Sequence, residues 1–180
     1  YSVFGKCHKL LLTDEEKRMI SGEDGELVKK SMEILVTLGE IFGAERLLPI
    51  SNVHSPGVSY RVAGDAGLKY VSDASKNGCF KVFTTLNTVG IDTATSTDLG
   101  FPKLFCERQR ELLDAYKNLG AIPTYTCTPY LVGNMPRFGE HVSWGESSAI
   151  AYVNSVIGAR TNREGGPSAL AAAVTGRVPT

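Results

Sequence analysis

Apolar and polar positions along this chain follow two different periods, which alternate from segment to segment. Apolar side chains that recur every three to four residues predict amphipathic helices. The helices expected on this basis cover residues 14–20, 24–44, 65–75, 101–120, 146–159 and 165–176. Stretches rich in β-branched and aromatic residues predict short strands at residues 45–50, 57–62, 80–85 and 121–126. Helices and strands that alternate in this way indicate an α/β fold.

The segments between these elements carry turn-forming residues and are expected to be loops. Residues 51–57 contain Asn, Ser, Pro and Gly, and residues 127–144 are broken by several Gly and Pro. Residues 86–100 are rich in Thr, Asn, Asp and Gly, and long loops of this kind in compact domains often carry function. At the first helix, Thr13 and Glu16 have the spacing of a capping box.

The composition excludes two classes of partner. Nineteen basic residues balance nineteen acidic ones, so no overall field draws the chain to nucleic acid or to an anionic membrane. No apolar run reaches the roughly 18 to 20 residues of a membrane-spanning helix, and the first residues lack a secretory signal. We therefore expect a cytoplasmic protein without nucleic-acid or membrane partners, whose 180 residues, 42% of them hydrophobic, can build one core.

The cysteine pattern differs from that of a disulfide-rich scaffold. The four cysteines are Cys7, Cys79, Cys106 and Cys127. They lie far apart, and no Cys-x-x-Cys pair offers a self-contained zinc site. Cys127 follows the strand expected at residues 121–126, and functional groups in α/β proteins commonly lie where strands end. It is either a small buried hydrophobe or a metal or cluster ligand whose sulfur receives hydrogen bonds from Thr124, Thr126 and Thr128.

Residues 158–173, GARTNREGGPSALAAA, gather hydrogen-bonding groups at the junction between two expected helices. In one interpretation Gly158 caps the first helix, the Gly-Gly pair opens the second, and the arginines are solvated. In another, the free N–H groups that begin the second helix bind an anion, and Arg160 and Arg163 grip its carboxylate or phosphate oxygens. A nucleotide-binding P-loop is excluded, because no Gly-Lys-Ser/Thr follows a strand here.

The loop expected at residues 51–57, together with the residues just after it, combines a histidine with small polar residues. His54 lies in this loop near Ser55, Gly57 and Ser59. His54 either forms hydrogen bonds within the protein or contacts a substrate together with these polar residues. His141 presents the same two alternatives.

Glu146, Ser147 and Ser148 begin the helix expected at residues 146–159. They either cap that helix or line the mouth of a site shared with Cys127. Two common enzyme motifs are absent from the sequence. The stretch GESSA lacks the second glycine of the Gly-x-Ser-x-Gly elbow of serine hydrolases, and no Gly-x-Gly-x-x-Gly opens a helix after a strand, as dinucleotide binding requires.

Several motifs together resemble one family. HSPGVSY, GDAGL, TTLNTVGID and the run at residues 119–177 are similar to the N-terminal part of the large subunit or domain of aconitase X. The resemblance covers residues 12–179, and its last run is the most specific part. It implies an aconitase-like α/β catalytic domain, with residues 13–180 as a truncated N-terminal portion and residues 1–12 as an upstream extension or linker.

The resemblance implies a hydro-lyase that dehydrates a hydroxy acid at an iron or iron–sulfur centre. Known members are cis-3-hydroxy-L-proline dehydratases in bacteria and mevalonate 5-phosphate dehydratases in archaea. We expect the first type, because residues 1–9 extend beyond the usual start of the family's large subunit and suggest a single-chain fusion. The alternatives are the large subunit of a mevalonate 5-phosphate dehydratase and a non-catalytic anion-binding module.

By this resemblance, Cys127 is a metal or cluster ligand, and Arg160 and Arg163 hold the substrate carboxylate. The polar lining of the substrate site would then be His54, Ser55, Gly57, Ser59, Asn134, Ser147, Ser148 and Asn162. Many members of the family have a cysteine where this chain has Tyr125, which puts a role of that position in doubt. The remaining cluster ligands, the catalytic base and the swivelling small subunit or fused small domain lie outside the chain, so we expect the fragment alone to be inactive.

Overall fold

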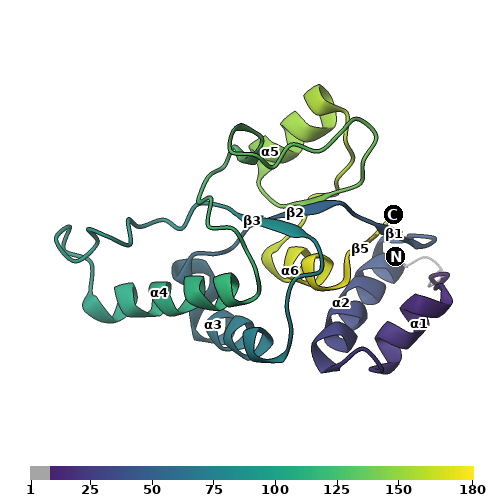
Figure 1. Ribbon diagram of the computed structural model, residues 1–180, viewed down its shortest axis with the longest axis horizontal. Helices are drawn as coiled ribbons and strands as arrows, with labels where there is room; N and C mark the ends of the chain where they lie inside the picture. Colours follow the sequence, from purple (N-terminus) through teal and green to yellow (C-terminus); the bar gives the residue numbers. More distant parts are fainter. Residues whose placement is uncertain (1–8) are drawn as a thin grey trace, which may run out of the picture.

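The computed structural model describes residues 9–180, and its centre is a small parallel sheet. Strand β2 (Asn52–Ser55) lies between β3 (Phe83–Leu86) and β4 (Ser143–Trp144). Helices cover the lower face of this sheet, and loops with one short helix cover the upper face (Figure 1). The α/β fold expected from the alternating periods is thereby confirmed.

The register of the sheet aligns residues from distant parts of the sequence. His54 of β2 is paired with Thr85 of β3 on one side and with Trp144 of β4 on the other. Beyond β4, Arg163 forms a parallel bridge to Trp144 and Arg160 one to His141, just before β4, so residues 160–163 run as an extended edge segment. A separate antiparallel pair joins strands β1 (Leu47–Pro49) and β5 (Arg177–Pro179).

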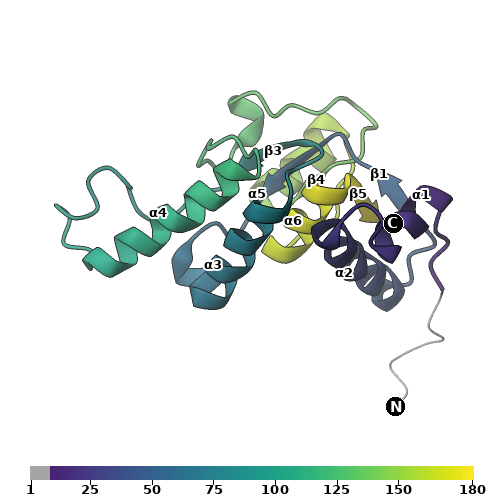
Figure 2. The same ribbon diagram turned by 60° about the horizontal axis from the view of Figure 1, so that its bottom comes forward.

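The lower layer is built around one central helix. Its members are α1 (Asp14–Ser21), α2 (Glu26–Phe42), α3 (Tyr60–Asn77), α4 (Lys103–Asn118) and α6 (Gly166–Thr175). Figure 2 shows α6 between α3 and α2. Residues 168–175 of α6 are all buried, and most of them are small, which lets the sheet and α2 approach closely. Leu170 packs with α3 and α4, whereas Ala171 packs with α2.

The helical predictions agree well with the structure at the N-terminal half. Helices α1, α2 and α4 lie where the 3.6-residue period placed them. The capping box is present, because Thr13 N donates to Glu16 Oε2 at 2.8 Å and Glu16 N donates to Thr13 Oγ1 at 3.3 Å. Helix α3 includes the expected residues 65–75 but begins earlier and is kinked at Gly64, whose φ is 60°.

The strand expected at residues 57–62 is wrong, because α3 already begins at Tyr60. The strand lies instead in the preceding segment, which was expected to be a loop, and it is the central strand β2. Its polar side chains can be buried because they form hydrogen bonds with other buried groups. The Trp144 indole Nε1 donates to Asn52 Oδ1 at 2.7 Å, and His54 contacts Thr85 at 2.9 Å.

The strand expected at residues 121–126 is also wrong. Only Ile122 pairs with the sheet, through a bridge to Thr85. Pro123 has no N–H to donate, and Tyr125 has a φ of 46°, which is incompatible with an extended strand.

The C-terminal helical period is confirmed with one interruption. The helix expected at residues 146–159 is α5 (Ser147–Tyr152) followed by a π-helical turn (Val153–Ile157), and Gly158 closes it in a left-handed conformation. The helix expected at residues 165–176 is α6. In the segment expected to be irregular, a 3-10 turn (Pro129–Leu131) and the two-residue strand β4 form.

The residues before α1 contact the body of the molecule. Leu10 is buried, and Leu11 N donates to Glu45 O at 2.9 Å. Residues 1–8 of the extension expected at residues 1–12, including Cys7, lie outside the described residues. Within residues 9–180, none of the helices combines the length and apolarity that crossing a membrane requires.

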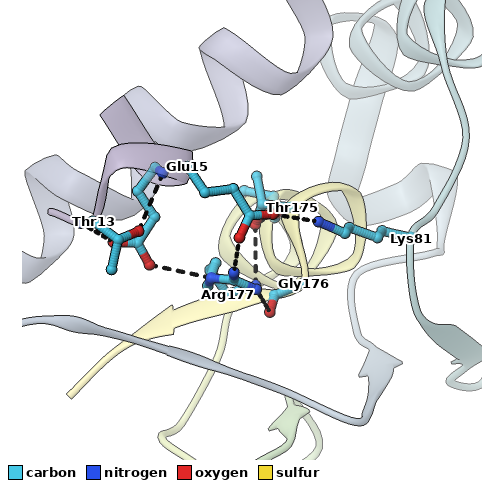
Figure 3. A network of polar contacts seen from close by, with 8 residues as sticks. Thr13, Glu15, Lys81, Thr175, Gly176 and Arg177 are labelled. Atoms are coloured by element: carbon cyan, nitrogen blue, oxygen red, sulfur yellow. Dashed lines mark hydrogen bonds and ion pairs between the residues drawn. The ribbon is translucent and has the colours of Figure 1, made fainter. Parts of the chain in front are cut away.

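An ion-pair network ties α1 to the C-terminal strand (Figure 3). The Arg177 guanidinium lies 3.1 Å from Glu16 and 2.8 Å from Glu15, and Lys81 reaches Glu15 at 3.2 Å. The Glu16 side chain is only 2% exposed, and its second oxygen accepts the Thr13 N–H of the capping box. Arg177 therefore compensates a buried carboxylate.

Replacing Arg177 with alanine should destabilise the fold by about 3 kcal/mol, because it leaves the buried Glu16 carboxylate without its counter-charge. The matched control is Arg108→Ala, since Arg108 pairs with Glu111 at 2.7 Å on the surface and such pairs contribute about 0–1 kcal/mol. Urea unfolding measures both. Equal losses in the two variants would contradict this role of Arg177.

Candidate functional site

The carboxyl ends of the three parallel strands meet at one edge of the sheet. Asn87 follows β3, and its N–H donates to Ser55 O at the end of β2 at 3.0 Å. On the other side, Gly145 N donates to His54 O at 3.1 Å. The Asn87 amide then reaches across β2 to Glu146 Oε2 at 3.2 Å. This edge, where ligands of parallel sheets usually bind, is the candidate site.

Cys127 lies at the same edge, in a turn attached to the end of β3. Thr124 Oγ1 donates to Leu86 O at 2.8 Å, and Thr126 N does so at 3.4 Å. The half-buried Cys127 Sγ lies 3.6 Å from Thr88 Oγ1. The thiol therefore faces the residues that follow β3.

The expected contacts of the flanking threonines with this sulfur are not formed. Thr124 bonds to the backbone, while the Thr126 and Thr128 hydroxyls bond to each other at 3.0 Å. The Thr126 hydroxyl also accepts the Thr128 N–H at 3.1 Å, which closes the turn around Cys127. Thr88, from the long loop, is the hydroxyl that contacts the thiol.

Tyr125 shapes this turn from its N-terminal side. Its φ of 46° lies in the left-handed region, which costs a non-glycine residue about 1 kcal/mol. Its side chain packs against the core cluster formed by α3 and α4. The packing and the hydrogen bonds to Leu86 hold a strained conformation two residues before Cys127.

Glu146, Ser147 and Ser148 cap α5 and also lie at the carboxyl edge. Glu146 Oε1 accepts hydrogen bonds from Ser148 N at 3.2 Å and from both serine hydroxyls at 3.3 Å. Burial raises the pKa of Glu146, but the hydrogen bonds from Ser148, Asn87 and Ser147 outweigh it and lower that pKa. The edge thus carries an ionised carboxylate, next to two exposed serines.

His54 does not lie in an exposed loop, as the sequence suggested, but is fully buried in β2. Its Nδ1 lies 2.9 Å from Thr85 Oγ1, and its ring contacts the Trp144 indole edge-on at 5.9 Å. Burial lowers the pKa of His54 to about 4, against smaller upward effects of the Thr126 backbone and the Glu146 carboxylate. The ring is therefore neutral at neutral pH.

Asn134 belongs to the same buried cluster as His54. Its Nδ2 donates to Thr85 Oγ1 at 2.8 Å and to Val53 O at 3.2 Å. The structure thus brings His54 and Asn134 together beneath the edge, through Thr85.

The other residues expected beside His54 surround the start of α6 and α3. Ser55 is buried at the end of β2. Gly57, with a φ of 74°, lies so close to α6 that a Cβ would be 3.4 Å from Gly166 Cα. Ser59 occupies the position before α3 and is half-buried, and His141 is half-buried beside Arg160.

The structure separates the two arginines that were expected to grip one anion. Arg163 and Asn162 line a cavity of about 1190 Å³ between the start of α6 and α2. Arg160 does not line it, because three residues of extended chain span roughly 10 Å. Asn162 is tethered by its Nδ2, which donates to Pro179 O at 2.8 Å.

Sequence reasoning missed Asn87, Thr88 and the buried Glu164. Asn87 and Thr88 follow the strand expected at residues 80–85, so the rule that functional groups lie where strands end could have found them. Glu164 also lines the cavity, and burial raises its pKa.

One metal ligand fits the geometry of the edge. Among residues 9–180, no three or more His, Cys, Asp or Glu side chains gather closely enough to hold a metal ion. Cys127 is half-buried and open toward the carboxyl edge, so it can serve as one ligand of a centre whose other ligands come from elsewhere.

Comparison with known proteins identifies the family to which this fold belongs. The family model described as aconitase X first domain matches residues 9–180. The chain belongs to the aconitase X family. A crystal structure of Thermococcus kodakaraensis aconitase X in its holo-form superposes with a TM-score of 0.85 at 47% identity, covering 94% of this chain and 42% of that one.

Two groups of aconitase X relatives match the chain. The phosphomevalonate dehydratase large subunit of Methanothermobacter thermautotrophicus is 52% identical over 95% of this chain and 43% of its own length. The cis-3-hydroxy-L-proline dehydratase of Hypocrea jecorina is 37% identical over 93% of this chain and 28% of its own length. The chain thus spans less than half of these relatives.

The buried, neutral His54 makes the stability of the fold depend on pH. Below its ordinary pKa of 6.5, His54 takes up a proton in the unfolded chain but not in the folded one, so acid favours unfolding down to about pH 4. The free energy of unfolding should therefore fall between pH 7 and pH 4 by roughly 3 kcal/mol more in the wild type than in His54→Gln. Urea unfolding at both pH values measures this difference. His141→Gln should keep the wild-type slope, and an unchanged slope in His54→Gln would rule out a buried neutral ring.

Proposed function

We propose that this chain is the N-terminal part of a hydro-lyase of the phosphomevalonate dehydratase large-subunit type. The observation that carries the proposal is the family match combined with a half-buried Cys127 at the carboxyl edge of a parallel sheet. Phosphomevalonate dehydratase large subunits match at 44–52% identity, whereas cis-3-hydroxy-L-proline dehydratases match at 35–37%. These identities favour the alternative over the hydroxyproline type expected from residues 1–9.

In this proposal Cys127 is one ligand of an iron or iron–sulfur centre. Such a centre, when bound, supplies a Lewis acid for the hydroxyl that leaves the substrate. Thr88 contacts the thiol and fixes its direction. Glu146 accepts hydrogen bonds from Asn87 and from both serines after it, and these bonds lower its pKa. Through them Glu146 orients Asn87, Ser147 and Ser148 toward the substrate.

The second proposed element is an anion-binding site at the end of the carboxyl edge that lies away from Cys127. Arg163 lies beside the first turn of α6, where free N–H groups and the helix dipole favour negative charge. Three strand spacings, about 14 Å, separate β3 from the segment that carries Arg163. Phosphomevalonate has an anionic group at each end, so it can reach from the Cys127 side toward Arg163. The relatives are named large subunits, and we propose that a small subunit completes the site.

The test uses the full-length protein with its small subunit, reconstituted with iron and sulfide without oxygen. Phosphomevalonate and cis-3-hydroxy-L-proline are offered in parallel. We expect dehydration of phosphomevalonate, and loss of both bound iron and turnover in Cys127→Ser. The turnover loss should be at least about 100-fold, since even outer-shell partners of a metal are worth 10- to 100-fold.

Cys79→Ser is the matched control, because Cys79 is an exposed cysteine away from the edge. It should retain iron and turnover. Turnover of cis-3-hydroxy-L-proline alone would overturn the proposed substrate type. A Cys127→Ser protein that still binds iron and turns over substrate would overturn the ligand assignment.

A further inference from the structure

A buried polar cluster centres on Thr85, next to Leu86, to which the turn that carries Cys127 is hydrogen-bonded, and the bonds of the cluster run in one direction. His54, Thr85 and Asn134 are each at most 1% exposed. Thr85 Oγ1 is the shared atom, 2.9 Å from His54 Nδ1 and 2.8 Å from Asn134 Nδ2. Because all three come from different elements, their contacts link β2, β3 and the loop before β4.

The Asn134 end of the cluster fixes the direction of these bonds. Val53 O is a backbone carbonyl and can only accept, so the NH₂ group of Asn134 must point toward it at 3.2 Å. The same NH₂ group then donates its second hydrogen to Thr85 Oγ1. The Thr85 hydroxyl is left with its own single hydrogen to donate.

Two acceptors compete for the Thr85 hydrogen. His54 Nδ1 lies at 2.9 Å, within the ordinary range, and Val53 O lies at 3.4 Å, beyond it. Thr85 therefore donates to Nδ1, and the neutral imidazole carries its proton on Nε2.

His54 Nε2 is thus a buried N–H donor, and it has no hydrogen-bond partner among the described residues. Thr126 lies nearby, because its N–H donates at 3.4 Å to the carbonyl of Leu86, the residue after Thr85, and its backbone raises the pKa of the His54 ring. A buried donor left unpaired costs about 1–3 kcal/mol, so a conformation that supplies an acceptor is favoured. The Thr126 carbonyl belongs to the peptide group that joins Thr126 to Cys127.

We propose that His54 is a positioning residue: in the conformation that supplies an acceptor, its Nε2–H binds the Thr126 carbonyl and so orients the Cys127 thiol for its ligand role. Asn134 and Thr85 hold the imidazole in the required tautomer. The strained backbone of Tyr125 restricts the same turn from the other side. This inference rests on the proposed function, because orienting Cys127 matters only if the thiol is a ligand.

The test measures alkylation of Cys127 by iodoacetamide in the intact, metal-free protein, resolved by mass spectrometry, with the exposed Cys79 as internal reference. His54→Gln can place an N–H group near the position of Nε2, whereas the shorter amide of His54→Asn can accept from Thr85 but does not reach that position. Loss of one hydrogen bond should raise the Cys127 rate about fivefold in His54→Asn. The rate in His54→Gln should stay close to that of the wild type, and His141→Asn should leave it unchanged.

Equal Cys127 rates in His54→Asn and His54→Gln would overturn the proposal. A second measurement needs no substitution that affects folding: the ring nitrogen shifts of His54 in the wild type report the tautomer. The Nε2–H form is expected, and the Nδ1–H form would overturn the proposal. Both measurements use metal-free protein, so a failure of the proposed dehydratase function leaves their outcomes unaffected.

Discussion

The close approach of α6 to the sheet is the constraint on which the rest of the structure depends. Ala169, Ala172 and Ala173 pack under β2 with Val53, while Leu170 and Ala171 on the other sides of the helix join two further clusters. Larger side chains would not fit, since overpacking a core costs about 1–3 kcal/mol. The same approach brings Gly166 against Gly57, which follows β2. The start of α6 therefore lies against the end of the central strand β2.

This constraint explains why the candidate site lies at the carboxyl edge. Parallel strands release their following loops at the same edge, so residues far apart in the sequence meet there. Asn87 and Glu146 bond to each other across β2, and Thr88 contacts Cys127. Inside the sheet, His54, Thr85 and Asn134 form a buried hydrogen-bonded cluster. The edge therefore combines an exposed polar surface with a buried hydrogen-bonded foundation, which is how precise sites are commonly supported.

The sequence predicted the helices well and the strands poorly, for physical reasons. Long amphipathic helices such as α2 repeat their period often enough to stand out. Strand β2 has only four residues, three of them polar and followed by Pro56 and Gly57, so nothing local distinguishes it from a loop. It becomes a strand because β3 and β4 form backbone hydrogen bonds with it on both sides. Its polar side chains are also paired, His54 with Thr85 and Asn52 with Trp144.

The candidate residues followed the same pattern. Cys127 and Thr88 could each be singled out as residues that follow an expected strand, but their contact could not be predicted, because α4 separates them in the sequence. The paired role of Arg160 and Arg163 was expected from their place at the junction between two helices. The structure makes this segment extended beside β4, which places their backbones roughly 10 Å apart, and only Arg163 lines the cavity.

Anomalous X-ray scattering at the iron edge, from crystals of the iron-loaded full-length protein, tests most directly whether the carboxyl edge holds a metal centre through Cys127. We expect an anomalous peak within bonding distance of Cys127 Sγ, on the side that faces Thr88 and Glu146. Iron bound elsewhere in the protein, with the Cys127 thiol free, would contradict it.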